Sequence, residues 1–200
     1  MKKLFTLLAL TITYTMNAQM SDNSANNNTA GSYAVAMGYL TTASGDYSIA
    51  TGQSTIASGS RSIAMGQSTT ASGSRSIAMG FNTTASGDGS TAMGQSTTAS
   101  GYSSTAMGYY TLASGDGSTA MGISTTASDY ASVVIGQYNS SGYSATSVSS
   151  FSTSAPAFVI GNGTASNAKS DAFKVMFNGD ATVSNDLTVS GDVVISSDAR

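Results

Sequence analysis

Residues 62–75 have the sequence Ser-Ile-Ala-Met-Gly-Gln-Ser-Thr-Thr-Ala-Ser-Gly-Ser-Arg, and close copies of this unit fill the middle of the chain. Glycine recurs there with a strict spacing of fourteen, at Gly38, Gly52, Gly66, Gly80, Gly94, Gly108, Gly122 and Gly136. A second glycine column, offset by seven, runs from Gly31 through Gly115 and ends at Asp129. Self-similarity at a fixed period predicts a solenoid with one coil per repeat.

Each fourteen-residue unit contains two short alternating runs, Ser-x-Ala-x and Thr-x-Ala-Ser, and glycine closes each of them. Alternation with a period of two predicts two short β-strands per coil, and the glycines of the first column are the predicted turn residues. A glycine at every seventh residue and the many Ser and Thr residues exclude helix. We therefore expect an all-β protein built from parallel coils.

The lumen of so small a coil accepts only small side chains stacked on their own copies. Ala and Thr occupy the constant positions of the two strands, so we expect them to point inward. The predicted lumen residues are Ala50, Ala64, Ala78, Ala92, Ala106 and Ala120 in the first strand, and Thr55, Thr69, Thr83, Thr97, Ala57, Ala71, Ala85 and Ala99 in the second.

Alternate residues of the first strand must then point outward, because successive side chains of a strand lie on opposite faces. They form an apolar stripe along a rod about 35 Å long, at about 4.8 Å per coil. The stripe consists of Val35, Met37, Ile49, Ile63, Met65, Ile77, Met79, Met93, Met107, Met121, Val133 and Ile135. Such a stripe is not typical of a soluble monomer. Another part of the chain could cover it, but identical stripes on identical rods favour self-association.

The composition argues against catalysis and metal binding. The 200 residues include no Cys or His, and all ten acidic residues are Asp. Without Cys or His there is no catalytic triad, thiolate metal site or disulfide. The net charge is −3, and no basic patch is available to follow a phosphate backbone. We expect no enzyme activity, no cofactor and no nucleic-acid partner.

The two ends of the chain differ from its middle. Lys2, Lys3 and the apolar run after them predict a signal peptide over residues 1–18, followed by a polar tail over 19–30, so we expect export and no membrane span in the mature chain. Residues 138–156 have no period and predict a linker or neck after a head at 31–137.

Residues 157–200 predict a short-strand β shaft, truncated before a further domain. Strands are expected near 157–161 and 172–177, the second leading into an Asn-Gly turn. A six-residue period then begins, with Asp at 180, 186, 192 and 198 and Val183, Val189 and Ile195 between them. Such units predict very short strands stacked in register, and they are similar to shaft segments of phage tail fibres and surface fibres.

The repeat Ser-Ile-Ala-Met-Gly followed by Thr-x-Ala-Ser-Gly resembles the YadA-like head of trimeric autotransporter adhesins, over Gly31 to about Gln137. The resemblance implies a left-handed parallel β-roll, three chains side by side, the apolar stripe at the trimer axis, and a non-enzymatic adhesin exposed at the cell surface. Two features depart from the family pattern. Met replaces Ile in six copies, and the usual Asn before Ser is replaced by Tyr47, Arg61, Arg75, Gly89, Ser103 and Gly117.

Two other functions remain open on the sequence alone. The closing residues 196–200 resemble the start of an endosialidase-type intramolecular chaperone, which would indicate a phage-derived fibre. A flat-lattice binder, such as an ice-binding protein, could use the second outward column, which consists of Thr42, Ile56, Thr70, Thr84, Thr98, Leu112 and Thr126. The extracellular protein or glycan that an adhesin would bind is not specified by uniform Thr, Ser and Gly coils.

Overall fold

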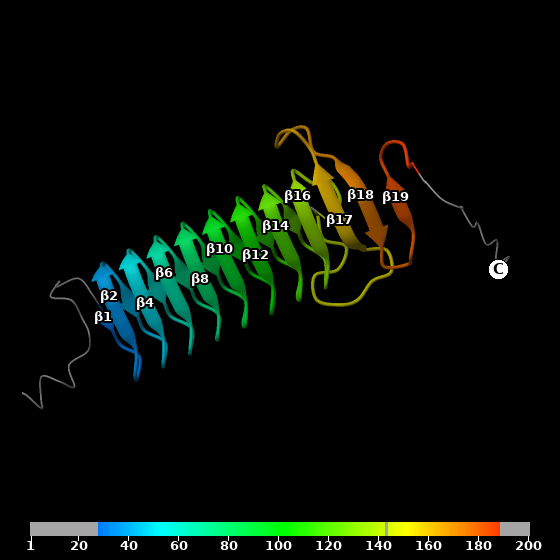
Figure 1. Cartoon of the computed structure of the whole chain (residues 1–200). Helices are drawn as coiled ribbons and strands as arrows, with labels where there is room; N and C mark the ends of the chain where they lie inside the picture. The colour runs from blue at the N-terminus through cyan, green and yellow to red at the C-terminus, as the bar shows by residue number, and fades with distance from the viewer. Residues whose placement is uncertain (1–27, 143, 189–200) are drawn as a thin grey trace, which may run out of the picture.

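The computed structural model describes residues 28–142 and 144–188, which contain strands and turns but no helix (Figure 1). The predicted signal peptide, the tail up to residue 27, and the shaft units at Val189, Asp192, Ile195 and Asp198 lie outside the described residues. Within those residues the predicted all-β solenoid of fourteen-residue coils is confirmed.

Each coil contributes one long strand and one short strand. The five-residue strands are β2 (Val35–Tyr39), β4 (Ile49–Gln53), β6 (Ile63–Gln67), β8 (Ile77–Phe81), β10 (Thr91–Gln95), β12 (Thr105–Tyr109), β14 (Thr119–Ile123) and β16 (Val133–Gln137). The two-residue strands are β1 (Asn28–Thr29), β3 (Thr42–Ala43), β5 (Ile56–Ala57), β7 (Thr70–Ala71), β9 (Thr84–Ala85), β11 (Thr98–Ala99), β13 (Leu112–Ala113) and β15 (Thr126–Ala127).

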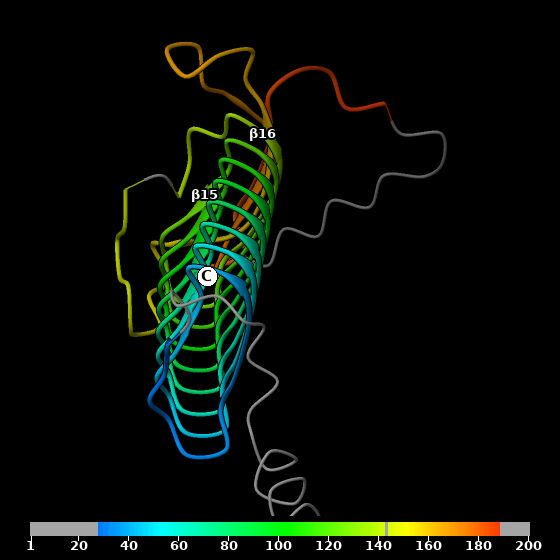
Figure 2. The same ribbon diagram turned by 90° about the vertical axis from the view of Figure 1, so that its left-hand side faces the viewer.

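The strands form two sheets, one on each side of the rod. The short strands make an eight-stranded sheet in chain order, and the long strands make most of an eleven-stranded sheet. Neighbouring coils pair in parallel with a shift of fourteen residues, so that Met93 lies opposite both Met79 and Met107. Viewed along the rod, the coils superimpose as nested loops (Figure 2). Every side chain therefore stacks on its own copy in the next coil.

The corners of each coil depend on residues in the left-handed backbone region. Arg61 and Arg75, at one corner, have φ of 59° and 58°, and Ser68, at the other, has φ of 55°. Their N–H groups donate to carbonyls of the preceding coil, as Arg61 does to Asp46 at 2.7 Å. Backbone pairing between coils thus continues around the corners, where backbone groups would otherwise have no partner.

The core of the roll is a column of small side chains. The alanines of both strands, from Ala43 to Ala127, are fully buried, and so are the lumen-facing threonines and serines between Thr55 and Ser118, apart from a 2% exposure of Thr111. Glycine at the second column follows from the same close stacking, because a Cβ on Gly59 would overlap the carbonyl oxygen of Gly73 in the next coil. The roll is thus held together by stacking of identical small residues and by backbone hydrogen bonds.

The carboxyl-terminal end differs from the sequence-based boundaries. Residues 138–142 and 144–155 do not lead away from the roll as a neck. The chain returns to the rod after them, where β17 (Pro156–Asn162) pairs with β16 in the same parallel register, Val134 opposite Val159. The fully buried Val159 continues the lumen column. The strand expected near 157–161 is therefore present, but its place beside the last coil was not predicted, because its sequence does not follow the fourteen-residue spacing.

The sheet ends in antiparallel strands. β18 (Asp171–Met176) pairs with β17, and β19 (Ala181–Val183) pairs with β18 through the turn that contains Gly179. The expected strand and Asn-Gly turn are therefore present, but they extend the long sheet of the roll (Figure 1). At the other end, Asn28 and Thr29 already pair with β3, so the roll begins within the predicted tail.

Candidate functional site: the apolar face of the long sheet

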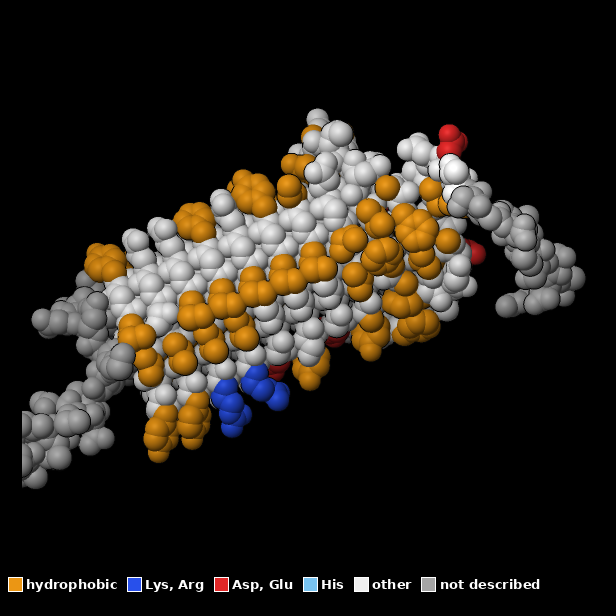
Figure 3. Space-filling model, in the orientation of Figure 1, with side chains coloured by type: hydrophobic (Ala, Val, Ile, Leu, Met, Phe, Trp, Pro, Cys, Tyr) orange, Lys and Arg blue, Asp and Glu red, His pale blue; other side chains and the backbone are white. Residues whose placement is uncertain are grey.

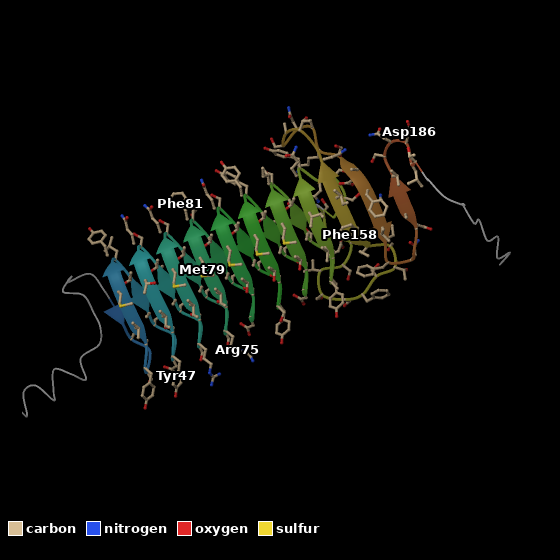
Figure 4. The ribbon with its side chains drawn as sticks, in the orientation of Figure 1. Tyr47, Arg75, Met79, Phe81, Phe158 and Asp186 are labelled. Atoms are coloured by element: carbon tan, nitrogen blue, oxygen red, sulfur yellow. The ribbon has the colours of Figure 1, made fainter. Side chains whose placement is uncertain are left out.

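The outer face of the long sheet carries two parallel columns of side chains, which we call the methionine face. They stand at the first and third positions of each long strand, as Ile77 and Met79 do in β8. The predicted stripe residues all lie on this face, namely Val35, Met37, Ile49, Ile63, Met65, Ile77, Met79, Met93, Met107, Met121, Val133 and Ile135. Figure 4 shows Met79 on this face, with Phe81 at the upper edge of the sheet.

The side chains of the methionine face are partly exposed rather than covered by another segment. Ile49 and Met65 retain 37% and 38% of their surface, and the other members are half-buried against their neighbours. Figure 3 shows the apolar side chains as a row along the rod. The described loop over 138–155 and the β17–β19 extension leave this row open.

The width of the apolar band changes along the rod. Branched aliphatic residues occupy the first column from β2 to β8, but Thr91, Thr105 and Thr119 replace them in the middle. The band widens again at the carboxyl-terminal end, where Phe158 of β17 packs edge-on against Phe173 of β18 at 6.3 Å (Figure 3). The sequence analysis did not assign Phe158 to this face, because its strand lies outside the fourteen-residue period.

The lumen residues lie on the opposite side of the same strands. All fourteen predicted lumen residues, from Ala50 to Ala120, are fully buried. The hydroxyls of Thr55, Thr69, Thr83 and Thr97 make no hydrogen bond to another described residue. Burying a hydroxyl without a partner is costly, so threonine here is explained by its size and its branched Cβ rather than by a polar contact.

The eight glycines predicted as turn residues lie inside strands. Each is the fourth residue of its long strand, as Gly66 is in β6, and not the residue after it. Gly66 has a φ of 122°, and a Cβ there would overlap the carbonyl oxygen of Gly80. Glycine is required because the strand bends into the corner while still pairing with the next coil.

Charged and aromatic side chains line the lower edge of the rod, away from the methionine face (Figure 4). The rings of Tyr33 and Tyr47 stack at 5.1 Å, and the Arg61 guanidinium lies 5.9 Å from the Tyr47 ring. Asp46 and Asp88 link neighbouring coils, because each carboxylate accepts a hydrogen bond at 2.8 Å from an N–H of the preceding coil. These aspartates therefore tie neighbouring turns together.

Two polar side chains that the sequence analysis missed close the last coil. Asn139 is fully buried, accepts a hydrogen bond from the Thr126 N–H at 2.8 Å and donates to the Thr126 carbonyl at 2.9 Å. Its amide thus replaces the next strand of the short sheet. The buried carboxylate of Asp129 accepts the N–H groups of Thr146 and Ser147. The sequence does contain a signal for both residues. Asn139 stands where the next Thr after Thr125 would be expected, and Asp129 stands where the next Gly after Gly115 would be expected.

Asp171 fixes β18 to the loop that follows the roll. Its carboxylate accepts hydrogen bonds from the Ser140 hydroxyl, the Ser140 N–H and the Ser141 N–H at 2.8–2.9 Å. Burial acts to raise the pKa of Asp171, but the hydrogen bonds from Ser141 and Ser140 outweigh it and lower the pKa below its usual value. The ionised carboxylate therefore stabilises this junction.

Neither metal ligands nor a membrane helix occur in the described part of the chain. Residues 28–142 and 144–188 contain no group of three His, Cys, Asp or Glu residues that could hold a metal ion. Over the same residues, no helix is long and apolar enough to span a membrane.

Comparison with known proteins identifies the repeats. The family model described as the YadA head domain repeat, which comprises two copies of the unit, matches residues 30–55, 57–83, 85–111 and 113–139. These matches together cover more than half of the 200 residues. No match to the chain occurs among curated proteins. The matched region coincides with the coils between β2 and β16.

Proposed function

The chain belongs to the YadA head domain repeat family, and from that premise we propose that it forms a homotrimer and serves as the head of an adhesive surface fibre. Head domains of this family form trimers, belong to surface-exposed adhesins and are typically non-enzymatic. Our proposal extends these properties to this chain, with the methionine face as the trimer interface. Export would depend on the predicted signal peptide over residues 1–18.

The observation that carries the proposal is the uncovered methionine face. A continuous apolar row about 35 Å long, for eight coils at about 4.8 Å each, is unusual on a soluble monomer. Each fully buried aliphatic or Met side chain contributes about 1.5–3 kcal/mol relative to exposure. In a homotrimer each chain would bury its methionine face against the same face of the other two chains, because every chain carries an identical stripe.

The charges of the described residues are compatible with that arrangement. No charged side chain belongs to the methionine face, and Asp46, Arg61, Arg75 and Asp88 lie in the turns at the edge of the rod. Burial of the face therefore requires no desolvation of an ion, which would be costly. The thioethers of Met65, Met79 and their copies adapt to irregular gaps, which suits packing around a symmetry axis.

The aromatic end supports the same interface. Ile160 lies opposite Phe173, and Phe158 lies opposite Val175, so these four side chains share the outer face of the extended sheet. We propose that they extend the trimer contact beyond Ile135. The threonines of β10–β14 would form a narrower and more polar middle, with the firmest contacts at the two ends.

The experiment is a comparison of two aspartate variants of the same coil. Met93→Asp places one carboxylate per chain on the methionine face, whereas Thr98→Asp places the same charge on the opposite sheet. Light scattering coupled to size exclusion at micromolar concentration measures the mass. We expect a three-chain mass for the wild type and for Thr98→Asp, and dissociation of Met93→Asp, because three clustered carboxylates repel one another and lose hydration.

Low pH provides a second readout of the same variant. Clustered carboxylates have a raised pKa and take up protons as the pH falls, so crosslinking at pH 4 should recover part of the Met93→Asp trimer. A one-chain mass for the wild type, or an unchanged trimer of Met93→Asp at both pH 7 and pH 4, would refute the proposed interface.

A further inference from the structure

Two adjoining cavities lie where the roll meets the β17–β19 extension. One, of about 180 Å³, is lined by Tyr110, Ser124, Thr126, Tyr138, Ser166 and Lys169. The other, of about 290 Å³, is lined by residues that include Ser140, Lys169, Asp171, Lys174, Thr182 and Ser184. Lys169 contributes to both, and Tyr138 and Ser140 are close neighbours in the chain, so the two cavities adjoin, and we call them together the polar hollow.

The hollow is built by backbone contacts rather than by side chains alone. The loop between β17 and β18 returns to the end of β16, where the Gly163 N–H donates to the Gln137 carbonyl at 3.2 Å and the Ser170 N–H donates to the Tyr138 carbonyl at 3.1 Å. The Gln137 side-chain amide donates to the Gly163 carbonyl at 2.9 Å. These bonds hold the loop between β17 and β18 beside the end of β16 (Figure 1).

Two tyrosines line the first cavity, Tyr110 and Tyr138. Tyr110, Ser124 and Tyr138 occupy the same corner of three successive coils, with φ of 54°, 50° and 44°. The two tyrosines are therefore two coil rises apart, about 9.6 Å, with a small serine between them. The Tyr110 ring is supported by an edge-on contact with Tyr109 at 4.4 Å.

The lining of the first cavity suits a sugar ring. Tyr110 and Tyr138 supply aromatic surface, and Ser124, Thr126 and Ser166 supply hydroxyl groups. A sugar ring packed against the tyrosines would therefore present its own hydroxyls to these three side chains.

The charges around the hollow favour an anionic ligand. The described residues include four Lys and Arg side chains, and two of them, Lys169 and Lys174, line these cavities. Asp171 is the one acidic residue among the lining residues, and its carboxylate already accepts hydrogen bonds from Ser140 and Ser141. The local charge is thus positive, although the whole chain has a net charge of −3.

We propose that this hollow binds an acidic saccharide. One sugar ring lies against Tyr110 and Tyr138, and its carboxylate or sulfate, or that of the next sugar, lies at Lys169 and Lys174. The site would supply a ligand for the attachment function proposed above, but it lies away from the methionine face and does not depend on trimer formation.

An oligosaccharide array tests the proposal with the tagged full chain. The array carries uronate-, sialate- and sulfate-bearing oligosaccharides beside neutral ones of matched length. We expect binding to a subset of the acidic saccharides, with at least tenfold weaker binding for Tyr110→Ala and for Lys174→Gln. The matched controls are Tyr102→Ala and Arg75→Gln, which remove an exposed tyrosine and a cation elsewhere on the rod and should bind like the wild type.

Light scattering on the same preparations separates this proposal from the trimer. A trimer that binds no acidic saccharide, binds neutral saccharides equally well, or loses binding equally in the two control variants overturns the saccharide site and leaves the proposed fibre head intact. A one-chain protein that still binds through Tyr110 and Lys174 supports the saccharide site and overturns the trimer.

Discussion

Left-handed backbone conformations recur in every coil and are occupied by residues poorly suited to them. Tyr47, Arg61, Arg75 and Ser103 have φ between 51° and 60°, at the position where the family pattern has Asn. Such conformations cost about 1–3 kcal/mol for most residues, whereas Asn and Gly adopt them more readily. Gly89 and Gly117 relieve this strain in two coils. Tyr47 and Arg61 instead gain contacts with a ring, because Tyr47 stacks on Tyr33 and the Arg61 guanidinium lies over the Tyr47 ring. Figure 4 shows Tyr47 at this edge of the rod.

Ser103→Asn is predicted to raise the free energy of unfolding by about 0.5–1 kcal/mol, because the exposed corner suits Asn better than Ser. The matched control is Ser104→Asn at the next residue, which is fully buried in the lumen. There the larger side chain should overpack the coil and cost about 1–3 kcal/mol. Thermal unfolding followed by circular dichroism compares the two, and equal shifts would contradict this explanation of the corner.

At the scale of the strand, the two sheets end in different ways. The long sheet continues past the last coil, because β17 pairs with β16 and β18 pairs with β17. Among the described residues, the short sheet has no strand after β15, and the Asn139 amide pairs with both backbone groups of Thr126 instead. Unpaired strand edges favour aggregation. The Asn139 side chain thus satisfies the edge of the short sheet, whereas the long sheet is extended by further strands and ends at β19.

Asn139→Ala is predicted to destabilise the last coils, because the buried Thr126 N–H and carbonyl would lose their partners at a cost of about 1–3 kcal/mol each. Amide hydrogen exchange should show faster exchange at Thr126 and in β15, with β3 to β9 unchanged. Asn82→Gly is the control, since Asn82 is exposed, its amide hydrogen-bonds Ser96 at 3.5 Å, and its φ of 55° suits glycine. Unchanged exchange at Thr126 would mean that the amide does not close the sheet.

For the whole molecule, repetition makes the coils interchangeable. Each coil contacts only its two neighbours, so stability is a sum over coils and interfaces. The pairing register between neighbouring coils is the single constraint on the whole roll. If one coil were shifted along the next by a number of residues that is not a multiple of fourteen, Met or Gly of one coil would lie beside lumen residues of the other. The same constraint aligns the methionine face into one stripe.

Deletion of residues 63–90 removes two coils and joins Ser62 to Thr91, which restores the repeat. We expect this variant to keep its β circular dichroism, with a lower melting temperature because two coil interfaces are lost. Deletion of residues 63–83 removes one and a half coils and joins Ser62 to Thr84, so a short strand stands where a long one is needed. That variant should misfold or aggregate on size exclusion, and equal folding of both would disprove the register argument.

The sequence by itself determined the repeating part of the molecule. Eight copies of the same glycines, alanines and threonines specify one coil many times over, so the strand pairs, the lumen and the outward Met column all followed from spacing and alternation. The exception within the coil was the glycine column at Gly66 and its copies, which lies inside the strand. Spacing alone does not distinguish a residue after a strand from one at which the strand bends.

Only the tertiary structure decided how the repeat ends. Several features of this end join single-copy residues that lie 13 to 31 positions apart in the chain. They are the return of the chain to the rod, the pairing of β17 with β16, the closure by Asn139 and the hollow around Lys169. Such contacts depend on the path of one particular loop, and no second copy in the chain signals them. The fourteen-residue repeat predicts the position of each residue on a coil, but it does not predict the contacts of the last coil, which has no further copy beside it.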